Sequence, residues 1–63
     1  MTHILVDGCQ SFSFTTNQFG VAVLRKALNG RTMRWQITGN FQMTKEEGRD
    51  FWRFLIRDGY TAA

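Results

Sequence analysis

Apolar and polar residues alternate through the stretch T-M-R-W-Q-I at positions 32–37. Because successive side chains of a strand point to opposite faces, this pattern predicts a strand with one apolar face, formed by Met33, Trp35 and Ile37. A three-residue loop at 38–40 would set Ile37 opposite Phe41 and Trp35 opposite Met43, so that these apolar side chains share one face. The pattern therefore predicts a short hairpin here.

A second hairpin is predicted near the N-terminus, where residues 3–6 and 10–15 flank the turn-forming pair Asp7-Gly8. In the later of these segments Phe12 and Phe14 alternate with serines, which is typical of a strand with one buried face.

Residues 17–28 are compatible with two structures, a strand that enters a hairpin at Asn29-Gly30 or a helix that ends at the same pair. On a helix with about 100° per residue, the apolar residues fill one side of the wheel: Phe19, Val21, Val23, Leu24, Ala27 and Leu28. This distribution favours the helix. Aligning the segment with residues 45–56 also superimposes Gly20 on Gly48, and this faint internal repeat points the same way.

Residues 43–60 carry the start and stop signals of one helix. Thr44 can accept a hydrogen bond from a free N–H group of the first turn, and Glu47 three residues later completes a capping box. The pair Asp58-Gly59 supplies the left-handed residue that ends the helix. Gly48 stands where alanine would be the better helix former, which indicates a close approach by another part of the chain.

Together these elements predict that residues 1–63 form a single small α+β domain, in which a small antiparallel sheet of two hairpins is packed by a C-terminal helix. If residues 17–28 are helical, the order of elements is ββαββα. The alternative is a five-stranded β-meander followed by one C-terminal helix.

A chain of 63 residues buries only about 60% of its unfolded surface, so a partner or a second copy would supplement its core. Cys9 is the only cysteine, which is typical of a reducing compartment and predicts a cytoplasmic protein. The N-terminal residues lack an apolar run long enough for a signal peptide or a membrane span, so we expect no membrane association.

The apolar side of the predicted C-terminal helix is wider than one face of a small sheet can cover. On the helical wheel it spans roughly 200°, with Trp52 and Phe54 at its opposite edges. We expect part of it to stay exposed and to bind another protein, because exposed aromatic and arginine side chains are favoured contact residues. The predicted contact residues are Trp52, Phe54, Arg49, Arg53 and Arg57.

Cations recur every fourth residue along the same helix, at Lys45, Arg49, Arg53 and Arg57. Together with Arg31 and Arg34 they form an alternative, nucleic-acid-binding set that would contact phosphates. Acidic residues at positions 46 and 50 lie in or beside this row, and the net charge of the chain is only +3. A third possibility is a structural homodimer that buries the leftover apolar side of the helix.

No motif for catalysis, metal binding or cofactor binding accompanies the helix. His3 and Cys9 are the only histidine and cysteine, and neither has an evident third group to orient it for nucleophilic catalysis. Glycine-rich nucleotide-binding motifs are absent from the sequence. We therefore expect a non-enzymatic protein with no cofactor, no metal and no small-molecule substrate.

One pattern in the second half of the chain carries a resemblance. It reads T-K-E-E-x-R-x-x-W-x-x-L and then G-Y, with the residues Thr44, Lys45, Glu46, Glu47, Arg49, Trp52, Leu55, Gly59 and Tyr60. It resembles the C-terminal helix of small accessory proteins encoded by bacteriophages and other mobile elements. The resemblance implies a protein that modulates a host protein by direct contact.

Overall fold

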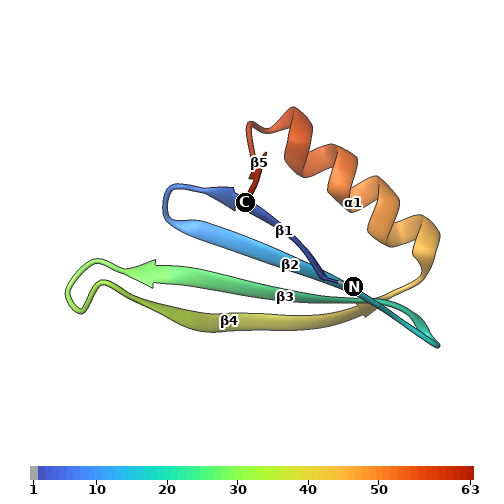
Figure 1. Cartoon of the computed structure of the whole chain (residues 1–63), viewed down its shortest axis with the longest axis horizontal. Coiled ribbons are helices and arrows are strands. Elements are labelled where there is room, and N and C mark those ends of the chain that lie inside the picture. The colour runs from blue at the N-terminus through green and yellow to red at the C-terminus, as the bar shows by residue number, and fades with distance from the viewer. Residues whose placement is uncertain (1) are drawn as a thin grey trace.

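The computed structural model describes residues 2–63, which form a five-stranded antiparallel sheet with one helix on one side of it (Figure 1). The elements follow in the order β1 (Thr2–Asp7), β2 (Gln10–Asn17), β3 (Gly20–Asn29), β4 (Arg34–Met43), α1 (Lys45–Arg57) and β5 (Thr61–Ala62). The sheet order is β4-β3-β2-β1-β5, so β5 returns after the helix to pair with β1. The α+β class is confirmed, in the form of the five-stranded alternative with a single C-terminal helix.

The predicted helix over residues 17–28 is wrong, because most of this segment lies in β3. A two-residue turn separates Asn17 of β2 from Gly20 of β3. In this turn Asn17 Oδ1 accepts a hydrogen bond from the backbone N–H of Phe19 at 2.9 Å, and Gly20 has a φ of 128°. The order ββαββα and the internal repeat are therefore wrong too. Both faces of β3 carry apolar side chains, so the alternation that marks a half-buried strand is absent from its sequence.

The predicted hairpin loop at 38–40 is also wrong, because β4 runs through it without a turn. The register shows a β-bulge instead: Arg25 of β3 lies opposite Gly39, whereas the next residue of β3 lies opposite Ile37. Thr38 is the extra residue of this bulge. An inserted residue changes which side chains share a face of the strand, so the two halves of β4 are out of phase with each other.

The bulge separates the apolar residues that the hairpin model had placed on one face. Phe41 and Met43 lie opposite Val23 and Val21 of β3, on the face toward α1. Trp35 and Ile37 lie opposite Leu28 and Lys26, on the other face. The expected contacts of Ile37 with Phe41 and of Trp35 with Met43 are therefore wrong.

The turn that joins β3 to β4 lies at residues 30–33. Asn29 Oδ1 accepts hydrogen bonds from the backbone N–H groups of Arg31 at 2.8 Å and Thr32 at 3.3 Å. The backbone oxygen of Asn29 accepts a third from Met33 at 2.8 Å, and Met33 has a φ of 56°. The pair Asn29-Gly30 thus begins a hairpin turn, which was the alternative interpretation of this segment.

The N-terminal hairpin is confirmed. Asp7 of β1 pairs with Gln10 of β2 across the turn, in which Gly8 has a φ of 47°. Phe12 and Phe14 are buried on the face of β2 toward α1, and Leu5 lies directly opposite Phe12. This hairpin supplies half of the buried core cluster.

Both predicted ends of the C-terminal helix are confirmed. Thr44 Oγ1 accepts a hydrogen bond from the Glu47 backbone at 3.1 Å, and the Glu47 carboxylate accepts one from the Thr44 backbone at 3.0 Å. At the other end Gly59 has a φ of 103°, and the N–H of Tyr60 donates to the Leu55 oxygen at 3.0 Å. This Schellman-type ending turns the chain back so that Tyr60 packs into the core.

The core lies between α1 and one face of the sheet. Its buried members are Leu5, Phe12, Phe14, Val23, Leu55 and Tyr60, with Val21, Met43, Phe51 and Trp52 packed against them. The predicted close approach at Gly48 is present, because a Cβ atom built there would lie 3.2 Å from the Cβ of Val21. This contact lets the first half of α1 lie close to β3.

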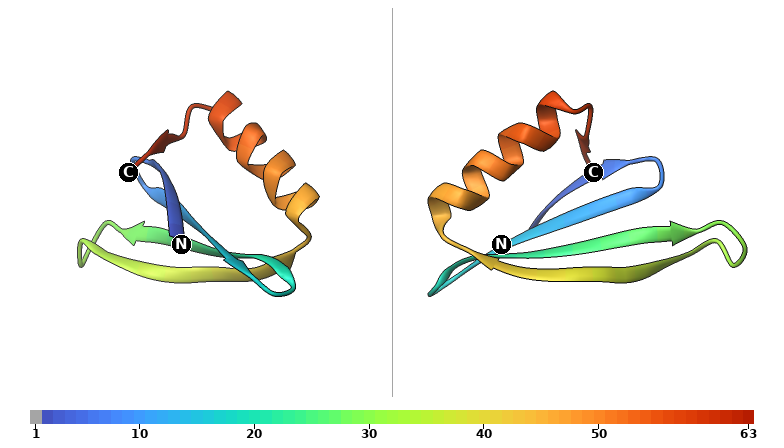
Figure 2. Two further views of the ribbon diagram at one scale, coloured as in Figure 1. Left: turned by 45° about the vertical axis from the view of Figure 1, so that its right-hand side comes forward. Right: turned by 180° about the vertical axis from the view of Figure 1, so that it is seen from behind.

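The opposite face of the sheet is open, as both views in Figure 2 show: α1 lies on one side only, and the β3–β4 hairpin extends beyond it. Ile4 and Trp35 are partly exposed on this face, and Ile37 is 65% exposed. The molecule therefore has one apolar face that α1 covers and one open face on which apolar side chains are partly exposed among polar ones.

Candidate binding groove

A groove with a volume of about 400 Å³ lies between α1 and the β2–β4 part of the sheet. We refer to it as the aromatic groove. Its lining residues are Gln10, Phe12, Arg25, Phe41, Met43, Phe51, Phe54, Leu55, Asp58 and Tyr60. The lining is mostly apolar with a few polar groups at its edges, which is the usual composition of a binding site.

Aromatic side chains form the floor and both walls of the aromatic groove. Phe12 packs edge-to-face against Phe51 and Tyr60, with ring centroids 5.2 Å and 5.6 Å apart, and these contacts fix the floor. Phe54 of α1 is 60% exposed and Phe41 of β4 is 42% exposed. The floor is therefore part of the core, whereas the two walls carry aromatic surface that the domain itself leaves uncovered.

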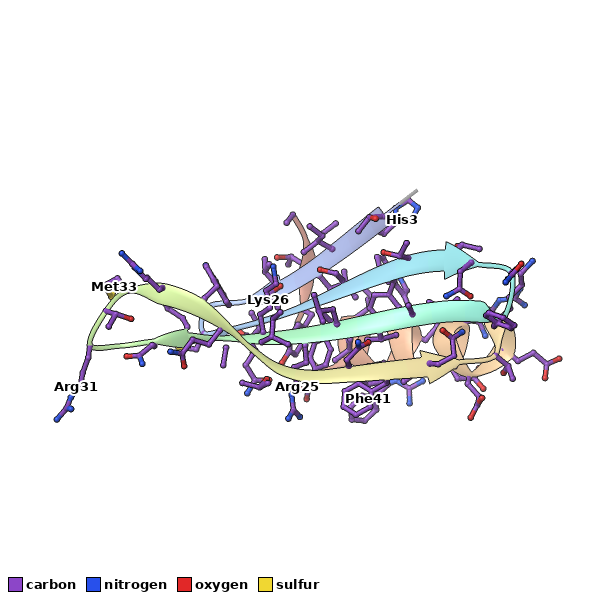
Figure 3. All side chains as sticks on the ribbon, turned by 90° about the horizontal axis from the view of Figure 1, so that it is seen from below. His3, Arg25, Lys26, Arg31, Met33 and Phe41 are labelled. Atoms are coloured by element: carbon purple, nitrogen blue, oxygen red, sulfur yellow. The ribbon has the colours of Figure 1, made fainter. Side chains whose placement is uncertain are left out.

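Arg25 is held at the sheet side of the groove by the bulge in β4. Its Nε donates to Thr38 Oγ1 at 3.0 Å, and its Nη2 donates to the backbone oxygen of Thr38 at 3.2 Å. Its guanidinium carbon lies 6.0 Å from the centroid of the Phe41 ring. Figure 3 shows Arg25 and Phe41 beside each other at the outer edge of β4. The arginine is therefore oriented before any ligand arrives.

Gly39 makes room for this arrangement. A Cβ atom at this position would lie 2.8 Å from two ring carbons of Phe41 and 3.6 Å from Arg25 Nε. The absence of a side chain at Gly39 thus allows the aromatic ring and the guanidinium group to lie over the strand together.

The inner end of the groove is polar. The Tyr60 hydroxyl donates a hydrogen bond to Gln10 Oε1 at 3.0 Å. Burial, followed by the nearby carboxylates of Asp7 and Asp58, raises the pKa of Tyr60 above its ordinary value of 10.0, while Arg25 acts in the opposite direction. Tyr60 therefore remains a neutral hydrogen-bond donor over the physiological pH range.

The two predicted aromatic contact residues of the helix lie in different surroundings. Trp52 is half-buried and packs edge-to-face against Phe14 at 5.1 Å and His3 at 6.2 Å, toward β1 and β2. Phe54 lines the aromatic groove. The structure therefore brings Phe54 to the groove and places Trp52 outside it.

The predicted basic residues lie in two separate places. Four of them are exposed along α1: Lys45, Arg49, Arg53 and Arg57. Arg31 lies at the tip of the β3–β4 hairpin, and Arg34 is the first residue of β4 (Figure 3). Because this tip projects beyond the helix (Figure 1), the structure does not join the two sets into one surface.

Sequence reasoning missed Arg25 and Phe41 as site residues. Arg25 belongs to the predicted helix over residues 17–28, and Phe41 to the second strand of the predicted short hairpin, so neither prediction brings the two together. The available signal was Gly39 in an otherwise strand-like stretch, because an isolated glycine in a strand often marks a bulge or a close approach.

The chain matches no protein-family model, no curated protein and no solved structure.

Two further findings concern residues 2–63. No three histidine, cysteine, aspartate or glutamate side chains in this range come together as a metal-binding group. In the same range, no helix has both the length and the apolar character needed to cross a membrane.

Proposed function

We propose that this protein is a non-enzymatic binding module that holds a segment of a partner protein in the aromatic groove. The observation that carries this proposal is the pair of exposed aromatic walls, Phe54 and Phe41, over a floor fixed by core packing. Large aromatic side chains around a preformed apolar groove are typical anchors of protein interfaces.

The energetic reason lies in the surface left uncovered. Burying a large apolar side chain contributes about 1.5–3 kcal/mol, and part of this gain remains available at Phe54 and at Phe41. The floor of the groove is already ordered, so a ligand would not have to order the floor as it binds.

The positions of His3 and Cys9 support a non-enzymatic role. His3 packs against Trp52 near the start of β1, whereas Cys9 is exposed in the turn after that strand. The extended chain from His3 to Asp7 alone spans roughly 13 Å, and Cys9 lies beyond it in the turn, too far for a nucleophile and its base.

The resemblance of the C-terminal helix to phage and mobile-element accessory proteins suggests a host protein as the partner. A free, exposed Cys9 fits a reducing compartment, so we place this interaction in the cytoplasm.

The test is quantitative interaction proteomics in host lysate with three versions of the protein: wild type, Phe54→Ser and Ile56→Ser. Ile56 is the matched control, because it is 47% exposed on the same helix but does not line the groove. We expect a partner that is recovered by wild type and Ile56→Ser and lost with Phe54→Ser. Equal recovery by all three, with circular dichroism showing folded variants, would contradict a role for the groove.

A second candidate function, nucleic-acid binding, is favoured by a separation of charge along the chain. Residues 8–45 contain five cations and no acidic residue: Arg25, Lys26, Arg31, Arg34 and Lys45. Two of these, Arg31 and Arg34, lie on or next to the projecting hairpin turn. Binding to phosphates by these residues would weaken steeply as salt rises from about 50 to 200 mM, and a salt-insensitive affinity for DNA and RNA would exclude this function.

A further inference from the structure

We infer that the occupant of the aromatic groove is an extended, acidic segment of the partner that pairs with the free edge of β4. This inference rests on the proposed function and names the chemistry and conformation of the ligand. It combines three features that meet at one place: a free strand edge, an oriented arginine and the aromatic walls.

Among the strands of residues 2–63, none lies beside the outer edge of β4. The backbone N–H of Leu28 in β3 donates to the backbone oxygen of Cys9, on the side of β2. Backbone groups of consecutive strand residues point to alternate sides, so the odd-numbered residues Val23 and Arg25 form their backbone hydrogen bonds toward β4. Their partners in β4, Phe41 and Gly39, therefore form their backbone hydrogen bonds with β3. It follows that the backbone groups of Asn40 and Gln42 point outward, where an added strand would meet them.

Beyond Arg34, this edge lacks two of the usual protections against strand pairing, charged residues and prolines. From Trp35 to Met43 the strand contains no charged residue and no proline, although edge strands commonly carry both. The bulge at Thr38 interrupts the edge, but Gly39 to Met43 continue in regular register with β3. A stretch of free backbone thus lies directly beside the aromatic groove, which suits recognition by strand addition.

Arg25 determines the charge of the ligand. Within residues 2–63 its hydrogen bonds go only to Thr38, through neutral acceptors, and its Nη1 makes none. The remaining N–H groups of a guanidinium oriented in this way fit a carboxylate, often in a bidentate manner. Asp58, the C-cap residue of α1, is the acidic residue that lines the same groove, and within residues 2–63 it makes no hydrogen bond to Arg25.

Strand geometry then predicts a spacing in the ligand. Side chains two residues apart in an added strand point to the same side of the sheet. Arg25 and Phe41 both lie on the side of α1, together with Phe54. The ligand therefore carries an Asp or Glu and a large apolar residue separated by one position, with the carboxylate at Arg25 and the apolar group between the aromatic walls.

The experiment begins with a random dodecapeptide library displayed on phage and selected on the immobilised full chain. We expect enrichment of an acidic residue and a large apolar residue at positions i and i+2. The affinity of one synthetic peptide is then measured by fluorescence anisotropy. Arg25→Gln should weaken binding about tenfold, because a charge-assisted hydrogen bond is lost, whereas Ile56→Ser should leave binding unchanged.

Two further measurements separate a direct contact from a general loss of structure. Replacing the acidic residue of the peptide by its amide should weaken binding to wild type by a similar factor and have little effect on binding to Arg25→Gln. Backbone amide exchange followed by NMR should slow at Asn40 and Gln42 when the peptide is bound, since these groups would then donate to the added strand.

The outcomes distinguish this inference from the proposed function. Peptides that require Phe54 but show no acidic preference and no protection of Asn40 and Gln42 would overturn the inference and leave the groove as a protein-binding site. A lack of any Phe54-dependent peptide would count against both. A wild-type dimer that Phe54→Ser converts to a monomer would assign the groove to a second copy and would also overturn the inference.

Discussion

The two ends of the β3–β4 ribbon show what one helix can and cannot do for a small sheet. Near Val21 and Met43 the ribbon lies close to α1, and both side chains pack against the core. Near Trp35 and Ile37 it extends beyond the helix (Figure 1), and both side chains are partly exposed on the face away from α1. All four of these residues are apolar, so their burial depends on which part and which face of the ribbon α1 covers.

The difference teaches that α1 packs one part of the domain and leaves apolar side chains of another part exposed. The buried cluster gathers residues from β1, β2, β3 and the C-terminal half of the helix. The aromatic groove lies at the boundary, since its floor belongs to this cluster and its walls do not. The following predictions compare substitutions in the buried cluster with substitutions at exposed positions and in the groove.

The largest expected effect compares Leu5→Ala with Ile37→Ala. Leu5 is fully buried, so its truncation should lower the free energy of unfolding by about 2–5 kcal/mol. Ile37 is 65% exposed on the open face, and its truncation should cost less than about 1 kcal/mol. Urea unfolding followed by circular dichroism measures both, and equal losses would show that the open face is as well packed as the core.

A smaller effect is expected from the same substitution at two glycines. Gly48→Ala places a Cβ atom 3.2 Å from Val21 in the covered part, and we expect a net loss of about 1 kcal/mol, because overpacking outweighs the gain in helix propensity. Gly39→Ala meets the Phe41 ring, which is free to turn outward, so its cost should stay below about 0.5 kcal/mol.

Thermal and urea unfolding of the two glycine variants provide the comparison. NMR of the Gly39→Ala variant should show a displaced Phe41 ring, with the core resonances unchanged. A stability loss at Gly39 as large as that at Gly48 would mean that the groove wall is part of the structural core.

A third, modest effect concerns the boundary itself, at Tyr60. Tyr60→Phe should cost roughly 0.5–1 kcal/mol at neutral pH, because the hydrogen bond to Gln10 is lost. The raised pKa of Tyr60 adds a stabilisation that is fully present below pH 10.0 and is lost as pH rises through the folded-state pKa. The stability difference between wild type and Tyr60→Phe should therefore shrink above about pH 10, and a difference that is constant with pH would contradict this assignment.

The parts of the fold that local signals specify could be predicted from the sequence. Thr44 and Glu47 form the expected capping box, Gly59 ends the helix, and Asp7 pairs across the expected turn. Each of these features depends on hydrogen bonds or backbone angles within a few residues. No long-range information is needed to recognise them.

The parts that depend on tertiary context could not be predicted in this way. β3 has apolar residues on both faces, such as Val23 toward the helix and Leu24 away from it, so its sequence also fits a helical wheel. The bulge at Thr38 changes which face of β4 the following side chains occupy. The apolar residues before and after it therefore fit a hairpin as well as a single bulged strand. Phe54 was identified from the helix pattern alone, whereas Arg25 becomes a site residue only once β3 and β4 are paired.

Finally, the two edges of the sheet are formed by strands of very different length. At one border the last residues of the chain run along β1, with Leu5 opposite Ala62 and the Ala63 N–H donating to Ile4 at 3.0 Å. β5 thus forms the border on this side, and at two residues it is a poor template for a further strand, whereas β4 at the other border is ten residues long. Repeated edge-to-edge pairing into a fibre requires two edges of useful length in every copy. This sheet offers one long edge and one very short edge, which disfavours such growth.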